Sequence, residues 1–224
     1  MHVQIYTMQS VAEARAVASL GVDHVGVTPA ALGLPGEISP RLAKRIIAAV
    51  KGKATSVALS VESDPRAIEN MVRTVRPDIL HLCGPPGALG PAAVACLRRG
   101  LPEIAVMQAI AVTGPTAVDV ARSYGSVVDY LILDSVDPDI PGVGAAGVVH
   151  DWEVSAAIVD AVDVPVILAG GLGPDNVADA IGAVRPWGVD SLTHTNRPEA
   201  GGAFRKDLNL VAAFRVAAQA ESLT

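Results

Sequence analysis

A short segment rich in β-branched residues recurs eight times along this chain, and this repetition constrains the fold more than any other feature. The segments have the composition of buried strands, and the stretches between them carry apolar residues at helical spacing. Two of those stretches begin with a capping residue followed by proline, at Ser39-Pro40 and Asp64-Pro65, which is typical of a helix start. Strands that alternate with helices form a parallel sheet, because each helix returns the chain to the same end of the sheet. The strands are expected at residues 2–6, 23–27, 55–61, 78–82, 103–112, 129–134, 165–169 and 189–193.

The number of strands and the chain length together indicate that this sheet closes. The chain has 224 residues and no break in composition that would mark a linker. An open, doubly wound sheet is the alternative, but eight parallel strands in so short a chain favour a closed barrel. The sequence therefore predicts one α/β domain over residues 1–224, a (β/α)8 TIM barrel.

Charge and composition limit the partners of such a barrel. A net charge of −6 supplies no basic stripe for a nucleic acid. No apolar run reaches the length of a membrane span, and the segment MHVQIYTM lacks the features of a signal peptide. Two cysteines, Cys83 and Cys96, do not make a disulfide framework. We expect a cytoplasmic enzyme, monomeric or homodimeric, with no cofactor and no nucleic-acid or membrane partner.

A glycine pair after the seventh predicted strand indicates an anion site. Gly170 and Gly171 allow a sharp turn and a close approach to the backbone, and Gly173-Pro174-Asp175 then begins a helix. A strand that enters a helix through glycine leaves N–H groups able to hold an anion, and barrels of this class bind phosphate after strands seven and eight. A tight turn without a ligand is the alternative. We expect a small phosphorylated or anionic substrate to bind here.

Polar residues at the ends of predicted strands are the candidates for chemistry, because the active site of such a barrel lies there. Asp134 ends an apolar run, and a buried carboxylate without a partner is costly, so a functional role is favoured over a structural cap. Tyr6 ends the first strand. His81 and Cys83 share one face of the fourth strand, although either can simply fill the barrel. On the eighth strand, Asp190 and His194 have the same parity.

Two further features leave functional alternatives open. Residues 136–149 form the longest irregular stretch, apolar and rich in glycine, and are expected to be a mobile lid. His81, Cys83, Asp134 and His194 carry groups that bind transition metals, although their spacing forms no metal motif. A metal-dependent barrel enzyme and a ligand-binding pseudo-enzyme are therefore both alternatives.

Short motifs in a fixed order resemble those of one known family. They are GVDHVG at 21–26, SPR at 39–41, LHLCG at 80–84, LDS at 133–135, Gly144 and Gly147 before Asp151-Trp152, LAGGL at 168–172, GVD at 188–190, and Lys206-Asp207. Over nearly its whole length the chain resembles phosphoribosylanthranilate isomerase, a tryptophan-pathway barrel that converts an N-glycosylamine into an aminodeoxyribulose phosphate. The resemblance implies that Asp134 is a general acid, that Arg41 and Asp190 bind substrate, and that Gly170 and Gly171 hold its phosphate.

The chain departs from the family's pattern at several site positions. Tyr6 stands where the family has its general base, a cysteine, and Cys83 stands where it has a histidine. The glutamine before that histidine is His81, and an arginine on the fifth strand is Ala111. After Asp190 the family reads Val-Ser-Ser-Gly-Val-Glu, whereas this chain reads SLTHTN, with His194 in place of glycine.

These departures bear on the reaction that the resemblance implies. The isomerisation needs an acid that protonates the sugar ring oxygen and a base that removes the C2 proton. A tyrosine with an ordinary pKa of about 10 is a poor base at neutral pH, which leaves Cys83 or His81 as replacements. His194 and Arg197 are expected to add positive charge at the phosphate, unless His194 turns outward to solvent. We expect weak or no activity on the family substrate, or activity on another small phosphorylated or acidic compound.

Overall fold

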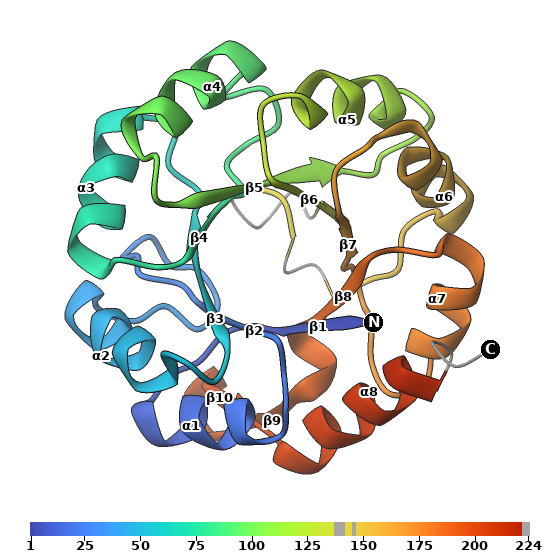
Figure 1. Cartoon of the computed structure of the whole chain (residues 1–224). Coiled ribbons are helices and arrows are strands. Elements are labelled where there is room, and N and C mark those ends of the chain that lie inside the picture. The colour runs from blue at the N-terminus through green and yellow to red at the C-terminus, as the bar shows by residue number, and fades with distance from the viewer. Residues whose placement is uncertain (137–141, 145–146, 221–224) are drawn as a thin grey trace.

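Eight parallel strands close into a barrel in the computed structural model, which describes residues 1–136, 142–144 and 147–220 (Figure 1). Each strand pairs with the next along the chain, and β8 closes the barrel on β1, where Gln4 lies opposite Asp190. The predicted fold class is therefore confirmed. The strands are β1 His2–Ile5, β2 His24–Val27, β3 Thr55–Ser60, β4 Ile79–Leu82, β5 Ala105–Ala111, β6 Tyr130–Asp134, β7 Val166–Leu168 and β8 Gly188–Ser191.

The helices surround this barrel and follow the strands one by one (Figure 1). Ser39 and Asp64 cap α2 and α3 as expected, because their side chains accept hydrogen bonds from the N–H groups of Leu42 and Arg66. No helix within the described residues has the length and hydropathy to cross a bilayer. The helices are α1 Val11–Ser19, α2 Pro40–Val50, α3 Pro65–Val75, α4 Pro91–Gly100, α5 Ala117–Gly125, α6 Trp152–Ala161, α7 Val177–Val184 and α8 Leu208–Ala220.

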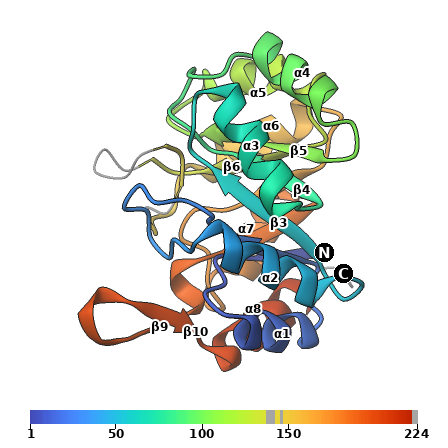
Figure 2. The same cartoon turned by 90° about the vertical axis from the view of Figure 1, so that its left-hand side faces the viewer.

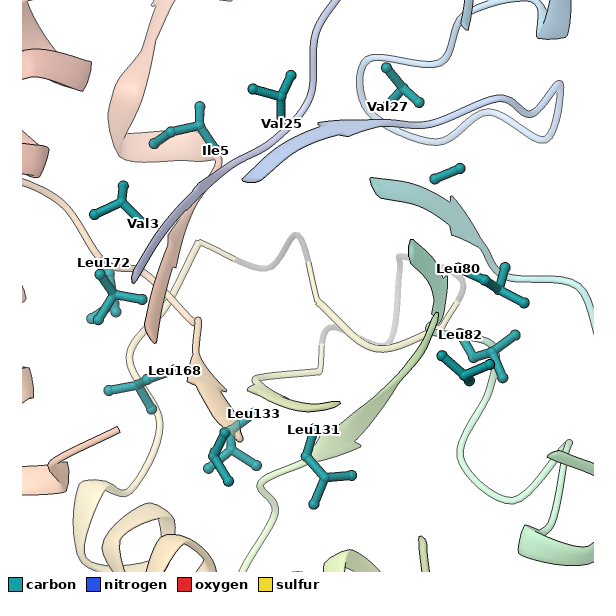
Figure 3. Packing of buried hydrophobic residues seen from close by; sticks show 14 of the residues in the cluster. Val3, Ile5, Val25, Val27, Leu80, Leu82, Leu131, Leu133, Leu168 and Leu172 are labelled. Atoms are coloured by element: carbon teal, nitrogen blue, oxygen red, sulfur yellow. The ribbon is translucent and has the colours of Figure 1, made fainter. Parts of the chain in front are cut away.

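Alternate residues of each strand serve two different cores. Val3 and Ile5 point outward from β1 into the layer between the strands and the helices, where the apolar side chains of the other strands join them (Figure 3). Residues of the opposite parity, such as Tyr6 and Ile132, fill the inside of the barrel. This alternation fixes which strand residues can reach a substrate at the mouth of the barrel.

A small antiparallel hairpin after β8 is a feature that the strand pattern does not predict. Its strands are β9 Asn196–Pro198 and β10 Phe204–Lys206, joined through the 3-10 turn η2, Ala200–Gly202. Figure 2 shows the hairpin projecting from the barrel. Arg197 lies on β9 opposite Arg205 and is exposed to solvent. The hairpin returns the chain to the barrel at Lys206.

The inside of the barrel is polar and aromatic at the N-terminal ends of the strands. His2 stacks on Trp187 with ring centroids 3.8 Å apart, and Tyr130 meets His24 edge-on. The ring of His24 forms a hydrogen bond of 3.1 Å with Gln4 Oε1. Burial, followed by the neighbouring His2, lowers the pKa of His24 to about 4.

The burial of His24 predicts that the free energy of unfolding decreases in acid. Between pH 6.5 and pH 4 the unfolded chain binds a proton at His24 and the folded chain does not, so stability falls as the pH falls. Relative to the variant His24→Gln, the wild type is expected to lose about 2 kcal/mol of unfolding free energy from pH 7 to pH 5. Urea unfolding at both pH values measures this difference. Equal losses in the two proteins would contradict the expectation.

Candidate active site

Five of the predicted site residues meet in one hollow at the C-terminal ends of the strands, which we call the mouth cavity. Tyr6 reaches it from β1, His81 and Cys83 from β4, Asp134 from β6 and Asp190 from β8. The remaining lining is largely apolar and comes from Thr28, Leu34, Pro35, Leu59, Val61, Ile132, Val143, Gly144 and Leu192.

The ring of Tyr6 extends across this cavity from β1 toward β4. Its hydroxyl oxygen lies 3.1 Å from Nδ1 of His81 in a buried hydrogen bond. A Cβ on Gly26 would lie 2.3 Å from two ring atoms of Tyr6, so the ring fits only because residue 26 is glycine. Burial raises the pKa of Tyr6 well above its usual value, and the charges of Asp190 and Cys83 add to the effect. Tyr6 is therefore neutral at physiological pH.

The two β4 residues are also neutral in the resting site. Burial lowers the pKa of His81 to about 3, and its Nε2 has no hydrogen-bond partner among the described residues. Burial, followed by the charge of Asp134, strongly raises the pKa of Cys83. Its thiol lies 3.6 Å from the carbonyl oxygen of Ser60. At neutral pH, Cys83 is a thiol and not a nucleophilic thiolate.

Asp134 has the properties that the sequence indicated for a general acid. It ends β6, and its Oδ1 accepts a hydrogen bond of 2.7 Å from the N–H of Ser135. Its Oδ2 would lie 2.6 Å from a Cβ on Gly144, so a glycine is required beside the carboxyl. Burial raises the pKa of Asp134 to about 7, although the hydrogen bonds from Ser135 act in the opposite direction.

Asp190 is a second carboxyl of the same kind in the mouth cavity. It is 7% exposed, and its Oδ1 has no hydrogen-bond partner among the described residues. Burial and the charge of Asp134 raise its pKa to about 7, whereas Gln4 and Lys206 act to lower it. The negative charge of Asp134 therefore favours the protonated form of Asp190 near neutral pH.

Lys206 is a buried residue that interacts electrostatically with Asp190 but lines neither hollow, and the strand pattern assigns it no role. It follows the hairpin and is 6% exposed. Its Nζ donates hydrogen bonds to the carbonyl oxygen of Leu192 at 2.9 Å and to Oγ1 of Thr195 at 3.1 Å. Burial lowers the pKa of Lys206 to about 7, while Asp190 and Glu13 favour the charged form. The sequence signal was the Lys206-Asp207 pair before the last helix.

A second hollow, which we call the glycine cup, adjoins the mouth cavity. Gly170 and Gly171 have φ angles of 81° and 63°, and their N–H groups donate no hydrogen bond within the described residues. Asp134 and Asp190 line both hollows. The cup is completed by Gly147, Leu172, Ser191, Leu192, Thr193 and His194.

The described part of the loop after β6 lies against the glycine cup. A Cβ on Gly170 would lie 2.5 Å from Nδ1 of His150, and a Cβ on Gly171 would lie 2.8 Å from the carbonyl carbon of Val148. His194 is exposed and its Nε2 lies 3.3 Å from the carbonyl oxygen of Gly147. The expected lid over 136–149 falls in part outside the described residues, at 137–141 and 145–146.

Two of the expected binding residues lie away from both hollows. Arg41 is exposed in the first turn of α2, and Arg197 is exposed on the hairpin. The groups proposed for a metal are also separated, since His194 lines the glycine cup whereas His81 and Cys83 line the mouth cavity. No group of three or more potential metal ligands occurs within the described residues.

Fold and site together define a (β/α)8 barrel enzyme, with the buried carboxyl of Asp190 and the half-buried carboxyl of Asp134 beside an amide-lined turn at the catalytic end of the barrel. The family model described as N-(5'-phosphoribosyl)anthranilate isomerase matches residues 3–214. A curated relative of that name from Natronomonas pharaonis is 35% identical over 195 residues, 87% of this chain and 86% of its own. The chain belongs to the N-(5'-phosphoribosyl)anthranilate isomerase family.

Solved structures of the family show the same fold. A monomeric form of a dimeric enzyme from Thermotoga maritima has a TM-score of 0.78 and 24% identity, covering 98% of this chain and 99% of that one. A second structure holds reduced 1-(o-carboxyphenylamino)-1-deoxyribulose 5-phosphate, with a TM-score of 0.77, 24% identity and the same coverage. We call that ligand the reduced analogue below.

The glycine cup predicts that a side chain at residue 171 weakens anion binding. The variant Gly171→Ala places a Cβ at a positive φ angle and close to Val148, so the turn must change shape. Inorganic phosphate should then bind about tenfold more weakly, which corresponds to about 1.4 kcal/mol. Titration calorimetry measures this, with Gly182→Ala on the exposed face of α7 as the control. Unchanged phosphate affinity in Gly171→Ala would count against the cup.

Proposed function

We propose that this protein catalyses the Amadori isomerisation of N-(5'-phosphoribosyl)anthranilate to the corresponding aminodeoxyribulose phosphate. The observation that carries the proposal is Asp134, a carboxyl with a pKa of about 7 that lines both the mouth cavity and the glycine cup. A group that is half-protonated near neutral pH can donate a proton during the reaction and regain it afterwards. A substrate with its phosphate in the glycine cup would extend its sugar toward this carboxyl.

The reaction has two stages, and Asp134 acts in the first. Asp134 gives its proton to the ring oxygen of the sugar as the bond between C1 and that oxygen breaks. The nitrogen lone pair forms a double bond to C1, which opens the ring to an iminium ion. A base then removes the C2 proton, and the resulting enolamine rearranges to the ketone. No external oxidant or reductant is needed, because C1 is reduced as C2 is oxidised.

Substrate binding falls to the groups around these two hollows. We propose that Gly170 and Gly171 hold the phosphate through their unpaired N–H groups, with His194 at the edge of the cup. Arg41 and Arg197 remain proposed binding residues. Both side chains are exposed to solvent, and neither lines the mouth cavity or the glycine cup.

The cellular compartment and the oligomeric state are also part of the proposal. We infer a cytoplasmic enzyme, monomeric or homodimeric, that acts on a small phosphorylated substrate. The free thiols of Cys83 and Cys96 are consistent with a reducing compartment. The pseudo-enzyme alternative is not favoured, because the acid position of the family is retained in Asp134 and its surroundings tune it for proton transfer. Weak activity stays a prediction.

A steady-state assay with N-(5'-phosphoribosyl)anthranilate tests the proposed function. The wild type should form the ketose, and Asp134→Asn should lower kcat by about 10²–10⁴-fold, because an amide cannot donate the proton. Asp160→Asn is the matched control, since this carboxyl lies on α6 and is 71% exposed. A wild type that forms no ketose, or an Asp134→Asn variant with wild-type kcat, would refute the proposed function.

A further inference from the structure

Resting on the proposed isomerisation, we propose that Asp190 is the general base that takes the C2 proton, in place of a residue on β1. Tyr6 stands where the family has the cysteine that acts as general base. Its hydroxyl is hydrogen-bonded to His81 and its pKa is raised well above the usual value, so Tyr6 does not take up a proton at neutral pH. The catalytic pair of this chain is then two aspartates on β6 and β8.

The two carboxyl groups lie where an acid and a base for this reaction are needed. Among the titratable side chains of the described residues, Asp134 and Asp190 are the two that line both the mouth cavity and the glycine cup. A sugar held by its phosphate in the cup lies at the boundary of the two hollows. A base and an acid must both be within hydrogen-bond reach of that sugar, and these two residues are at the boundary.

Tyr6 lines the mouth cavity but not the glycine cup. Its hydroxyl is engaged with His81 on β4, and its ring packs over Gly26 on β2. Strand β4 lies across the closed barrel from β8, and the turns after β7 and β8 form the glycine cup (Figure 1). The other groups on β4 are a neutral imidazole and a neutral thiol, neither of which lines the cup.

The charges around Asp190 also suit a base. The titratable groups that affect it are Asp134 from β6, Lys206 from β10 and Tyr6 from β1. The positive charge of Lys206 and the side-chain amide of Gln4 favour the ionised form of Asp190. Its Oδ1 has no partner among the described residues and is free to accept a proton. The Oδ1 of Asp134, by contrast, already accepts a hydrogen bond from Ser135.

The proton transfer follows directly from this arrangement. Asp190 takes the proton from C2 of the iminium ion, and the electron pair of that C–H bond forms the double bond between C1 and C2. The electron pair of the C1–N double bond returns to nitrogen, giving the enolamine. The proton is delivered to C1 as the C2 hydroxyl loses its own proton, so atoms and electrons balance within one substrate.

Paired variants test this assignment. Asp190→Asn should lower kcat by about 10²–10⁴-fold, because the amide cannot take the proton, and should bind the reduced analogue within about threefold of wild type. Tyr6→Phe keeps the ring and loses the bond to His81, and should lower kcat by no more than about tenfold. Asp160→Asn is the surface control for an Asp-to-Asn change.

The outcomes separate the base assignment from the proposed function. A folded Asp190→Asn enzyme whose kcat stays within tenfold of wild type overturns the assignment, as does one in which only KM rises. If Asp190→Asn does not fold, Tyr6→Phe decides: a kcat loss of about 10²-fold or more overturns the assignment, and a smaller loss supports it. A wild type that does not turn over the substrate refutes the proposed function itself.

Discussion

Asp134 and Asp190 line the same hollow at the mouth of this barrel, and the chemistry of the site depends on the free-energy cost of ionising them there. The raised pKa of Asp190 corresponds to about 4 kcal/mol that ionisation costs in the folded state. The folded protein therefore binds more protons than the unfolded chain between about pH 4 and pH 7, and stability falls as the pH rises through that window. The same shift places the group where proton transfer is efficient at neutral pH.

The barrel supplies the constraint that holds the two carboxyls together. Closure of β8 on β1 places Asp190 beside Gln4, and the alternation along β6 turns Asp134 inward while Leu131 and Leu133 pack outward under the helices. Lys206, at the end of the hairpin, contributes a positive charge that favours the ionised form of Asp190. Side chains from strands far apart in the sequence thus determine each other's protonation.

Much of this arrangement could be predicted from the sequence, because periodicity and capping are local signals. The barrel strands lie within a residue or two of the predicted segments, and the parity of Asp134 and Asp190 follows from the strands alone. The hairpin and the buried charge of Lys206 could not be predicted, since both depend on contacts made after the barrel closes. The hydrogen bond between Tyr6 and His81 could not be predicted either, because it joins two strands and no residue spacing within either strand indicates it.

Carbon NMR of the aspartate carboxyl groups tests most directly whether Asp134 and Asp190 both exchange their protons near neutral pH. With 13C-labelled aspartate carboxyls, two signals should titrate in coupled steps near pH 7, and the variants Asp134→Asn and Asp190→Asn assign them. In Asp134→Asn the remaining carboxyl, Asp190, should titrate at lower pH, because the repelling charge is gone. If every aspartate of the wild type titrates near the ordinary value of about 4, the account is contradicted.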